Sequence, residues 1–209
     1  MCCFSGICTV KITKENLEAH EWQVTYFETS AEAAEYLDRA IDKKTVGFGD
    51  SATLAAMEMN RRLSAHNTVY DPAAAKDNGE FLRLAKEALT TDVFLTSVNA
   101  LSQTGEMVNI DGTGNRVAGS LFGHDAVYFV AGTNKIVPTL DDALFRARNI
   151  AAPLNTSRKG YATPCAAKEN RCYNCSAPRR ICNAVTVYLQ KMNNADHVEI
   201  ILIGEPLGF

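Results

Sequence analysis

The stretch that decides the fold is AVYFVAGTNKIVPTLDDALFRARNI, residues 126–150. It opens with an apolar run, 126–131, which is typical of a strand buried on both faces of a sheet. A turn follows at 132–135, and Thr139 with Asp142 then predicts the capped start of a helix. A buried strand that leads into a helix is the repeating unit of a parallel α/β sheet.

The same alternation continues outward in both directions along the chain. We expect strands at 22–27, 44–48, 68–70, 92–97, 107–110 and 198–203. We expect helices at 30–42, 78–89, 117–122 and 182–191. A further helix should follow Ser51, with Ala52, Ala55, Met59 and Leu63 on one face, and the helix after Thr139 should bury Leu140, Ala143, Leu144, Ala147 and Ile150. The sequence therefore predicts a mainly parallel sheet with helices on both faces, whose ligands bind at the carboxyl ends of its strands.

Composition excludes several classes of protein. The chain has 209 residues, of which 46% are hydrophobic and 22% charged, as in an ordinary globular domain. It contains no apolar run of about 18 residues, so we expect no membrane span. The first residues, MCCFSGIC, lack the features of a secretion signal, so we expect a cytoplasmic protein. A net charge of -3 argues against general nucleic-acid coating.

Charge is distributed unevenly along this chain. Residues 146–180 contain eight cations and one anion, a net charge of +7 that leaves -10 for the remainder. One interpretation is a solvated basic face that can also meet an acidic partner. The other is a basic rim around bound anions or cysteine thiolates.

A glycine-rich motif, GFGDS at 47–51, lies between an expected strand and an expected helix. Small residues allow backbone amides to approach an anion, and the start of a helix favours negative charge. Gly49 and Ser51 are therefore candidate ligand-binding residues. The alternative is a plain tight turn in which the serine caps the helix.

The segment 104–116 is denser in polar and flexible residues. Glu106 and Asp111 are the candidate catalytic residues, since a carboxylate can serve as acid, base or nucleophile. The candidate ligand-binding residues here are Thr104, Gly105, Gly112, Gly114, Asn115 and Arg116. Asn134 and Lys135 join them, because a lysine at the carboxyl end of a strand can pair with an anionic substrate. The alternatives are a self-satisfied hairpin turn and a solvated lysine.

Seven cysteines, an odd number, argue against a disulfide framework. Four of them form a quartet near the C-terminus, namely Cys165, Cys172, Cys175 and Cys182. Four thiolates match the ligand count of a structural zinc or of an iron–sulfur cluster, and the spacing does not choose between them. Redox-active, disulfide-bonded or inert thiols are the alternatives. Cys2, Cys3 and Cys8 follow no ligand pattern.

Five motifs together resemble the LUD domain, the lactate-utilisation family. They are VGFGDS at 46–51, TSVNA at 96–100, TGEMVNIDGTGNRVA at 104–118, GTNKIV at 132–137 and IGEPLGF at 203–209. The resemblance covers 45–209. This body of the domain is similar to the small lactate-utilisation subunit, while the cysteine quartet is similar to that of a cysteine-bearing branch of the family. The whole chain, 1–209, is thus expected to be a single LUD-like domain. Residues 1–30 would be an N-terminal extension and 158–183 a cysteine-rich excursion.

The resemblance implies a three-layer Rossmann-like sandwich, similar to the sugar-phosphate isomerase and CoA-transferase superfamily. It implies a subunit or accessory of L-lactate or 2-hydroxy-acid oxidation that binds a small anionic metabolite. Iron–sulfur partner subunits and a homo-oligomer fit this role, and whether the chain is itself an enzyme stays open. One alternative is a CoA-transferase- or isomerase-like enzyme for an anionic metabolite. Another is a non-enzymatic regulatory module with a structural metal knuckle.

Overall fold

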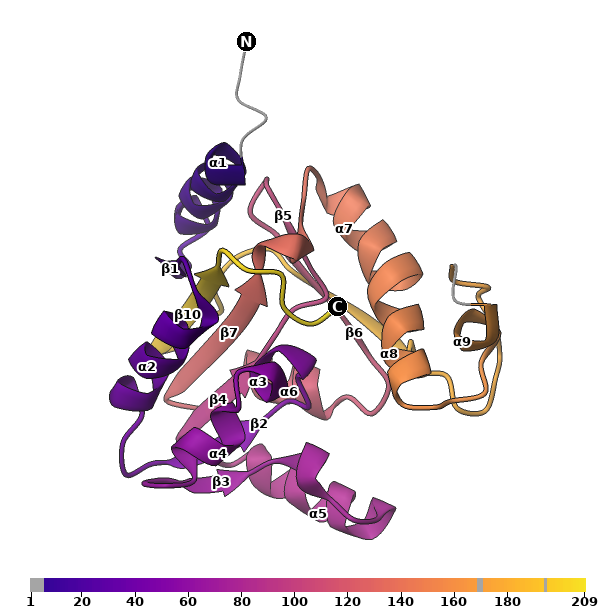
Figure 1. Ribbon diagram of the computed structural model, residues 1–209, viewed down its shortest axis with the longest axis horizontal. Helices are drawn as coiled ribbons and strands as arrows, with labels where there is room; N and C mark the ends of the chain where they lie inside the picture. Colours follow the sequence, from indigo (N-terminus) through magenta and orange to yellow (C-terminus); the bar gives the residue numbers. More distant parts are fainter. Residues whose placement is uncertain (1–5, 169–170, 194) are drawn as a thin grey trace.

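The computed structural model describes residues 6–168, 171–193 and 195–209. Its centre is a sheet of six parallel strands in the order β1-β10-β7-β4-β2-β3 (Figure 1). The strands are β1 (Gln23–Phe27), β2 (Thr45–Phe48), β3 (Thr68–Tyr70), β4 (Val93–Thr96), β7 (Ala126–Gly132) and β10 (His197–Ile203). The central strands are almost entirely buried, as expected for a parallel sheet covered on both faces.

Helices cover both faces of this sheet. One face packs against α2 (Ser30–Ala40), α3 (Ala52–Ala56) and α4 (Met59–Leu63). The other face packs against α1 (Gly6–Ala19), α5 (Asn78–Ala88) and α6 (Asn115–Leu121). The predicted α/β fold class, a Rossmann-like sandwich with a mainly parallel sheet, is therefore confirmed.

A second, smaller sheet adds a layer that the sequence did not predict. It has the order β8-β5-β6-β9, from β8 (Ile136–Val137), β5 (Ala100–Ser102), β6 (Met107–Asp111) and β9 (Ala184–Tyr188). One side joins the main core through Leu101, Met107 and Tyr188. The other side packs against a long helical segment drawn in orange in Figure 1, made of α7 (Leu140–Arg146), the π-helical turn η3 (Ala147–Ala151) and α8 (Ala152–Arg158). Short 3-10 turns η1 (Pro72–Ala74) and η2 (Thr133–Lys135) and helix α9 (Pro164–Lys168) complete the elements.

The helix predicted for residues 182–191 is wrong, because β9 occupies 184–188 and pairs antiparallel with β6. Its sequence alternates valine with threonine and ends in tyrosine, and such residues favour strands. The pairing partner lies more than 70 residues upstream and supplies the backbone hydrogen bonds. Local periodicity does not reveal such a partner.

The helix predicted after Ser51 is interrupted. Ser51 caps α3 as expected, but Glu58 adopts a left-handed φ of 53° and separates α3 from α4. The buried face of α3 also differs from the predicted one, because Ala55 is exposed while Thr53 and Leu54 are buried. Met59 and Leu63 are buried as predicted.

The helix after Thr139 begins with the predicted capping box but changes its phase at η3. A π-helical turn contains one residue more than an α-helical turn. Ile150, predicted to be buried, is therefore 42% exposed, while Ala151 and Ala152 point inward.

The segment 1–30 belongs structurally to the body of the protein from Gly6 onward. Within it, α1 buries Leu17 on the sheet, and β1 pairs with β10. Trp22 is also buried and packs edge-on against Phe129. None of the helices in the described residues combines the length and apolar character needed to cross a bilayer.

The strand order creates one crevice at the carboxyl edge of the main sheet. After β2 the chain moves outward to β3, and it then returns to the opposite side of β2 to form β4. The connections that leave β2 and β4 therefore diverge. Open α/β sheets bind ligands at such a switch point.

Candidate functional site

Two connected pockets lie at this edge of the sheet. The inner pocket has a volume of about 30 Å³ and lies between the connections that follow β2, β4 and β7. The outer cleft has a volume of about 450 Å³ and separates the loop after β6 from α8 and the cysteine-rich excursion. Asp50, Arg116 and Asn155 line both, so the inner pocket opens into the outer cleft.

Lys135 is the most deeply buried charged group of the inner pocket, with only 2% of its surface exposed. Its Nζ donates hydrogen bonds to Thr53 Oγ1 at 2.9 Å and to Ser97 Oγ at 2.8 Å. Burial, together with the positive charges of Arg146 and Arg116, lowers the pKa of Lys135 to about 7. A substantial fraction of this amine is therefore uncharged at neutral pH.

Two arginines surround the lysine and meet at Asn99. Arg116, from α6, donates to Asn99 Oδ1 at 3.1 Å and to the Ile110 carbonyl. Arg146, from α7, donates to the carbonyls of Asn99 and Asn134, and its burial lowers its pKa. A Cβ at Gly49 would lie 2.8 Å from Arg116 Cγ, so glycine at this position leaves room for the arginine.

Within the part of the chain that the structure describes, no carboxylate forms an ion pair with any of these three basic groups. Among the described residues, Lys135, Arg116 and Arg146 form hydrogen bonds with hydroxyl, amide or carbonyl groups, and none forms an ion pair. Buried charge is costly unless a partner of opposite sign compensates it. The inner pocket therefore offers an electrostatically favourable place for an anion.

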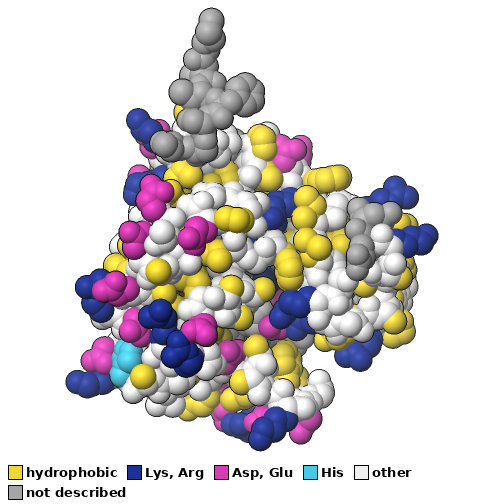
Figure 2. All heavy atoms as spheres, in the orientation of Figure 1, with side chains coloured by type: hydrophobic (Ala, Val, Ile, Leu, Met, Phe, Trp, Pro, Cys, Tyr) yellow, Lys and Arg dark blue, Asp and Glu magenta, His cyan; other side chains and the backbone are white. Residues whose placement is uncertain are grey.

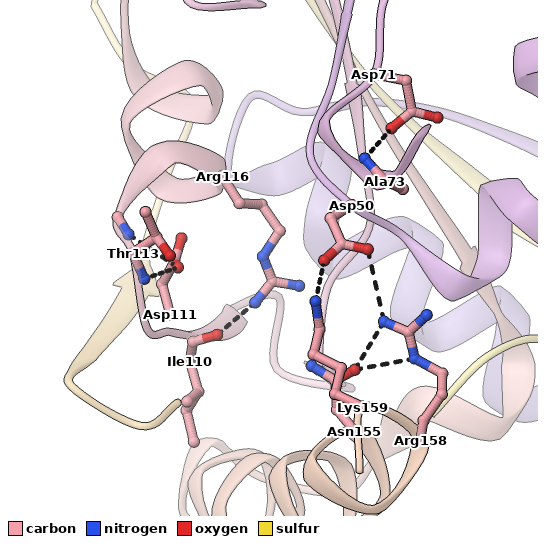
Figure 3. Close-up of polar contacts among 11 residues, drawn as sticks. Asp50, Asp71, Ala73, Ile110, Asp111, Thr113, Arg116, Asn155, Arg158 and Lys159 are labelled. Atoms are coloured by element: carbon pink, nitrogen blue, oxygen red, sulfur yellow. Dashed lines mark hydrogen bonds and ion pairs between the residues drawn. The ribbon is translucent and has the colours of Figure 1, made fainter. Parts of the chain in front are cut away.

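Asp50 fastens α8 to the main sheet (Figure 3). Its carboxylate accepts a hydrogen bond from Lys159 and lies 3.5 Å from the Arg158 guanidinium. Its backbone is left-handed, with a φ of 48°, a conformation that is uncommon for residues other than glycine. This strained residue after β2 keeps Arg158 and Lys159 at the rim of the site.

Asp111 lines the outer cleft, but its carboxylate is occupied by the backbone (Figure 3). Oδ1 accepts hydrogen bonds from the amides of Thr113 and Gly114 at 3.1 and 2.9 Å. Oδ2 accepts one from the amide of Val117 at 3.0 Å. Gly114 permits this loop, because its φ of 93° is unfavourable for other residues. Asp111 thus builds the start of α6, which positions Arg116.

Glu106 lies at the opposite end of β6, in the turn after β5. Burial raises the pKa of its carboxyl, but hydrogen bonds from Ser102 and Thr104 outweigh that effect and lower the pKa. Gly105 packs this turn on α1, since a Cβ there would lie 2.8 Å from the carbonyl oxygen of Asn16. Thr104, Gly105 and Glu106 line neither pocket.

The structure thus divides the predicted site residues. Those that line the two pockets are Gly49, Ser51, Asp111, Gly112, Asn115, Arg116 and Lys135. Asn134 has another role, because its side-chain oxygen accepts a hydrogen bond from the Leu207 amide at 3.0 Å and its side-chain nitrogen donates to the Gly208 carbonyl. Asn134 therefore holds the C-terminal segment across the inner pocket, where Phe209 forms part of the lining.

The cysteine-rich excursion forms one wall of the outer cleft. Asn183 donates hydrogen bonds to the carbonyls of Asp111 and Gly112, both at 3.0 Å. Residues 178–181 line the cleft opposite α6. Lys and Arg side chains gather over this part of the surface, at the right of Figure 2.

The four cysteines of the excursion are half-buried free thiols. Cys165 contacts the hydroxyls of Thr156 and Thr163, and Cys182 accepts a hydrogen bond from Arg180 at 3.3 Å. No three His, Cys, Asp or Glu side chains within the described ranges are grouped so that they could hold a metal ion.

The sequence did not mark the pocket residues Thr53, Ser97 and Asn99, nor Arg146, which donates to the carbonyls of Asn99 and Asn134 beside the pocket. Ser97 is the last residue of the strand predicted at 92–97 and Asn99 follows two positions later, so their place at the end of a strand could have marked them. Arg146 gave no such signal, because a cation near the end of a helix is explained by the helix dipole alone.

Comparisons with known proteins agree with this architecture. The model of the LUD domain family matches residues 10–203. The crystal structure of a DUF162 family protein from Deinococcus radiodurans is similar with a TM-score of 0.56 and 14% identity, over 97% of this chain and 100% of that one. At that identity the likeness concerns the fold. No curated protein matches the chain. Because the family model spans most of its length, the chain belongs to the LUD domain family.

Proposed function

We propose that this chain binds a small metabolite with a carboxylate group where the inner pocket opens into the outer cleft. In this proposal it serves as a subunit or accessory of the oxidation of L-lactate or a similar 2-hydroxy acid. The observation that carries the proposal is the group of Lys135, Arg116 and Arg146, which lacks any carboxylate partner among the described residues. The family's association with lactate utilisation supports the choice of acid.

The residues suggest how the acid is bound. Arg116 lines both pockets, and its guanidinium offers two parallel donors to a carboxylate. The Thr53 and Ser97 hydroxyls can bond the hydroxyl or carbonyl oxygen of the acid beside Lys135. Arg146 contributes its charge and holds the two connections in place through the carbonyls of Asn99 and Asn134.

Oxidation of a hydroxy acid also requires an electron acceptor. Iron–sulfur partner subunits would supply one, and the outer cleft lies beside the basic wall at 178–181 where an acidic partner would be attracted. Zinc or an iron–sulfur cluster on the cysteine quartet remains a separate proposal. Its test is metal analysis of protein purified without air, compared with Cys172→Ser; equal metal content in both would contradict it.

The CoA-transferase- or isomerase-like alternative has weaker support. It needs a carboxylate that is free to act as nucleophile or base. Both oxygens of Asp111 accept backbone hydrogen bonds, and Glu106 lies outside the two pockets.

Calorimetric titration of the purified chain tests the proposal. L-Lactate, pyruvate and oxalate should bind, while lactamide, which lacks the charge, should not. Arg116→Gln should weaken the binding of every acid. Lys86→Met, on the exposed side of α5, is the matched control for loss of a positive charge and should bind as the wild type does. Equal affinity for lactate and lactamide, or no binding of any acid, would overturn the proposal.

A further inference from the structure

The environment of the Lys135 amine differs from that of a lysine that only forms an ion pair. It is buried, it faces two hydroxyl groups, and no carboxylate contacts it among the described residues. We propose that Lys135 is a covalent catalytic residue that forms an imine with the carbonyl carbon of a 2-oxo acid. This inference rests on the proposed function, because the same pocket must first bind the acid.

The shape of the site suits a carbonyl group at the end of a small acid. The inner pocket has space for about two water-sized groups, enough for the carbonyl carbon and oxygen beside Lys135. Arg116 lies where this pocket opens into the outer cleft, so it can hold the carboxylate while the carbonyl points inward. Orienting the acid in this way brings the reacting atoms together.

The electrostatic environment keeps the amine reactive. A lysine becomes a nucleophile when burial and neighbouring cations favour its uncharged form. Burial and the charges of Arg146 and Arg116 act in this direction and bring the pKa of Lys135 to about 7. Lys159 differs, because its amine forms an ion pair with Asp50.

The reaction balances without an oxidant or reductant. The lone pair of Lys135 Nζ attacks the carbonyl carbon, a C–N bond forms, and the carbonyl oxygen takes a proton to give a carbinolamine. That hydroxyl then leaves as water after taking up a second proton, and the C–O bond breaks. The amine loses one proton, so one net proton from solvent converts amine and oxo acid into protonated imine and water. The Ser97 and Thr53 hydroxyls, which already accept hydrogen bonds from Nζ, are placed to relay these protons.

Reductive trapping tests the inference. The full chain is incubated with pyruvate and sodium cyanoborohydride, digested, and mapped by tandem mass spectrometry. We expect the reduced adduct on Lys135 at several-fold higher occupancy than on exposed Lys86. L-Lactate, which has no carbonyl group, should give no adduct, and oxalate should protect Lys135 by competition. Lys135→Arg should abolish the site-specific adduct, and Lys86→Arg should leave it unchanged.

Two outcomes separate this inference from the function on which it rests. If pyruvate binds in calorimetry but Lys135 carries no adduct, or no more than Lys86, the imine is excluded and acid binding stands. If no acid binds and no adduct forms, both proposals fail. Because mapping uses the wild-type chain, the result does not depend on whether Lys135→Arg folds.

Discussion

The two ends of strand β6 carry similar residues but have different surroundings. Both ends have a carboxylate, a threonine and glycine, and only five positions separate Glu106 from Asp111. The Glu106 end is a turn packed on α1 and made of hydroxyl–carboxylate hydrogen bonds. The Asp111 end starts α6 and opens into the cleft beside Arg116. A motif that is continuous in sequence therefore need not be one site, because a strand carries its two ends far apart.

The largest expected difference between the ends concerns ligand affinity. Arg116→Gln removes a charge-assisted hydrogen bond worth about 1.5–3 kcal/mol, so the Kd for a small acid should rise by roughly ten- to a hundredfold. Glu106→Gln should leave the Kd within about twofold, since it lies outside both pockets. Isothermal titration with oxalate gives both values. A large loss of affinity in Glu106→Gln would show that the turn at 104–106 takes part in binding.

The next effect concerns stability at the Asp111 end. Asp111→Ala removes three hydrogen bonds to backbone amides at the start of α6. The free energy of unfolding should fall by about 2 kcal/mol, comparable to losing a strong helix cap. Urea denaturation followed by circular dichroism measures this value. If the variant kept the wild-type free energy of unfolding, the structural role assigned to Asp111 would be wrong.

A smaller effect concerns stability at the Glu106 end, and it depends on pH. The pKa of Glu106 is lowered in the folded chain, because hydrogen bonds from Ser102 and Thr104 outweigh the opposing effect of burial. Stability from this carboxylate is thus present above the pKa of the unfolded chain and is lost as the pH falls through the folded value. Glu106→Gln should be destabilised at pH 7 by about 1 kcal/mol. The difference from wild type should shrink toward pH 3; a difference independent of pH would contradict this assignment.

The smallest effect is a change in the number of protons bound by Lys135 in the inner pocket, beside Arg116. An anion in the inner pocket favours the charged form of Lys135 and raises its pKa above the anion-free value of about 7. Binding near pH 7.5 should therefore take up a fraction of a proton, and affinity should fall as the pH rises above 7. Titrations in buffers with different ionisation enthalpies measure the uptake. The Lys135→Met variant should show none, and the Glu106→Gln variant should match the wild type.

The main sheet could be predicted from the sequence because the residues of each strand indicate a strand without any knowledge of its pairing partner. The run at 126–131 is apolar throughout, and its position before a turn and a capped helix leaves few other interpretations. The second sheet could not be predicted in this way. Strand β9 at 184–188 is only partly buried and depends on β6 for its hydrogen bonds. The sequence of the segment itself does not reveal a partner so distant along the chain.

The candidate site could likewise be predicted where it depends on the main sheet, but not where it depends on the second sheet. Gly49, Ser51 and Lys135 follow strands of the main sheet, and the rule that ligands bind at carboxyl ends of strands located them. Arg146 donates to the carbonyls of Asn99 and Asn134 beside the pocket, whereas Glu106, which belongs to the same motif as Asp111, lies outside both pockets. Both placements depend on the second sheet, which separates neighbours in sequence and brings together residues that are distant in it.

The π-helical turn at 147–151 fixes the rotational phase between two halves of one helical segment. Arg146 lies before this turn and supports the floor of the inner pocket, while Asn155, Arg158 and Lys159 lie after it and form the rim. Each residue of a helix advances the side chains by about 100°. Deleting one residue from the turn would therefore swing the rim away from Asp50 without changing a single side chain of the pocket. A length change of one residue, far from any motif, is thus enough to separate the floor of the site from its rim.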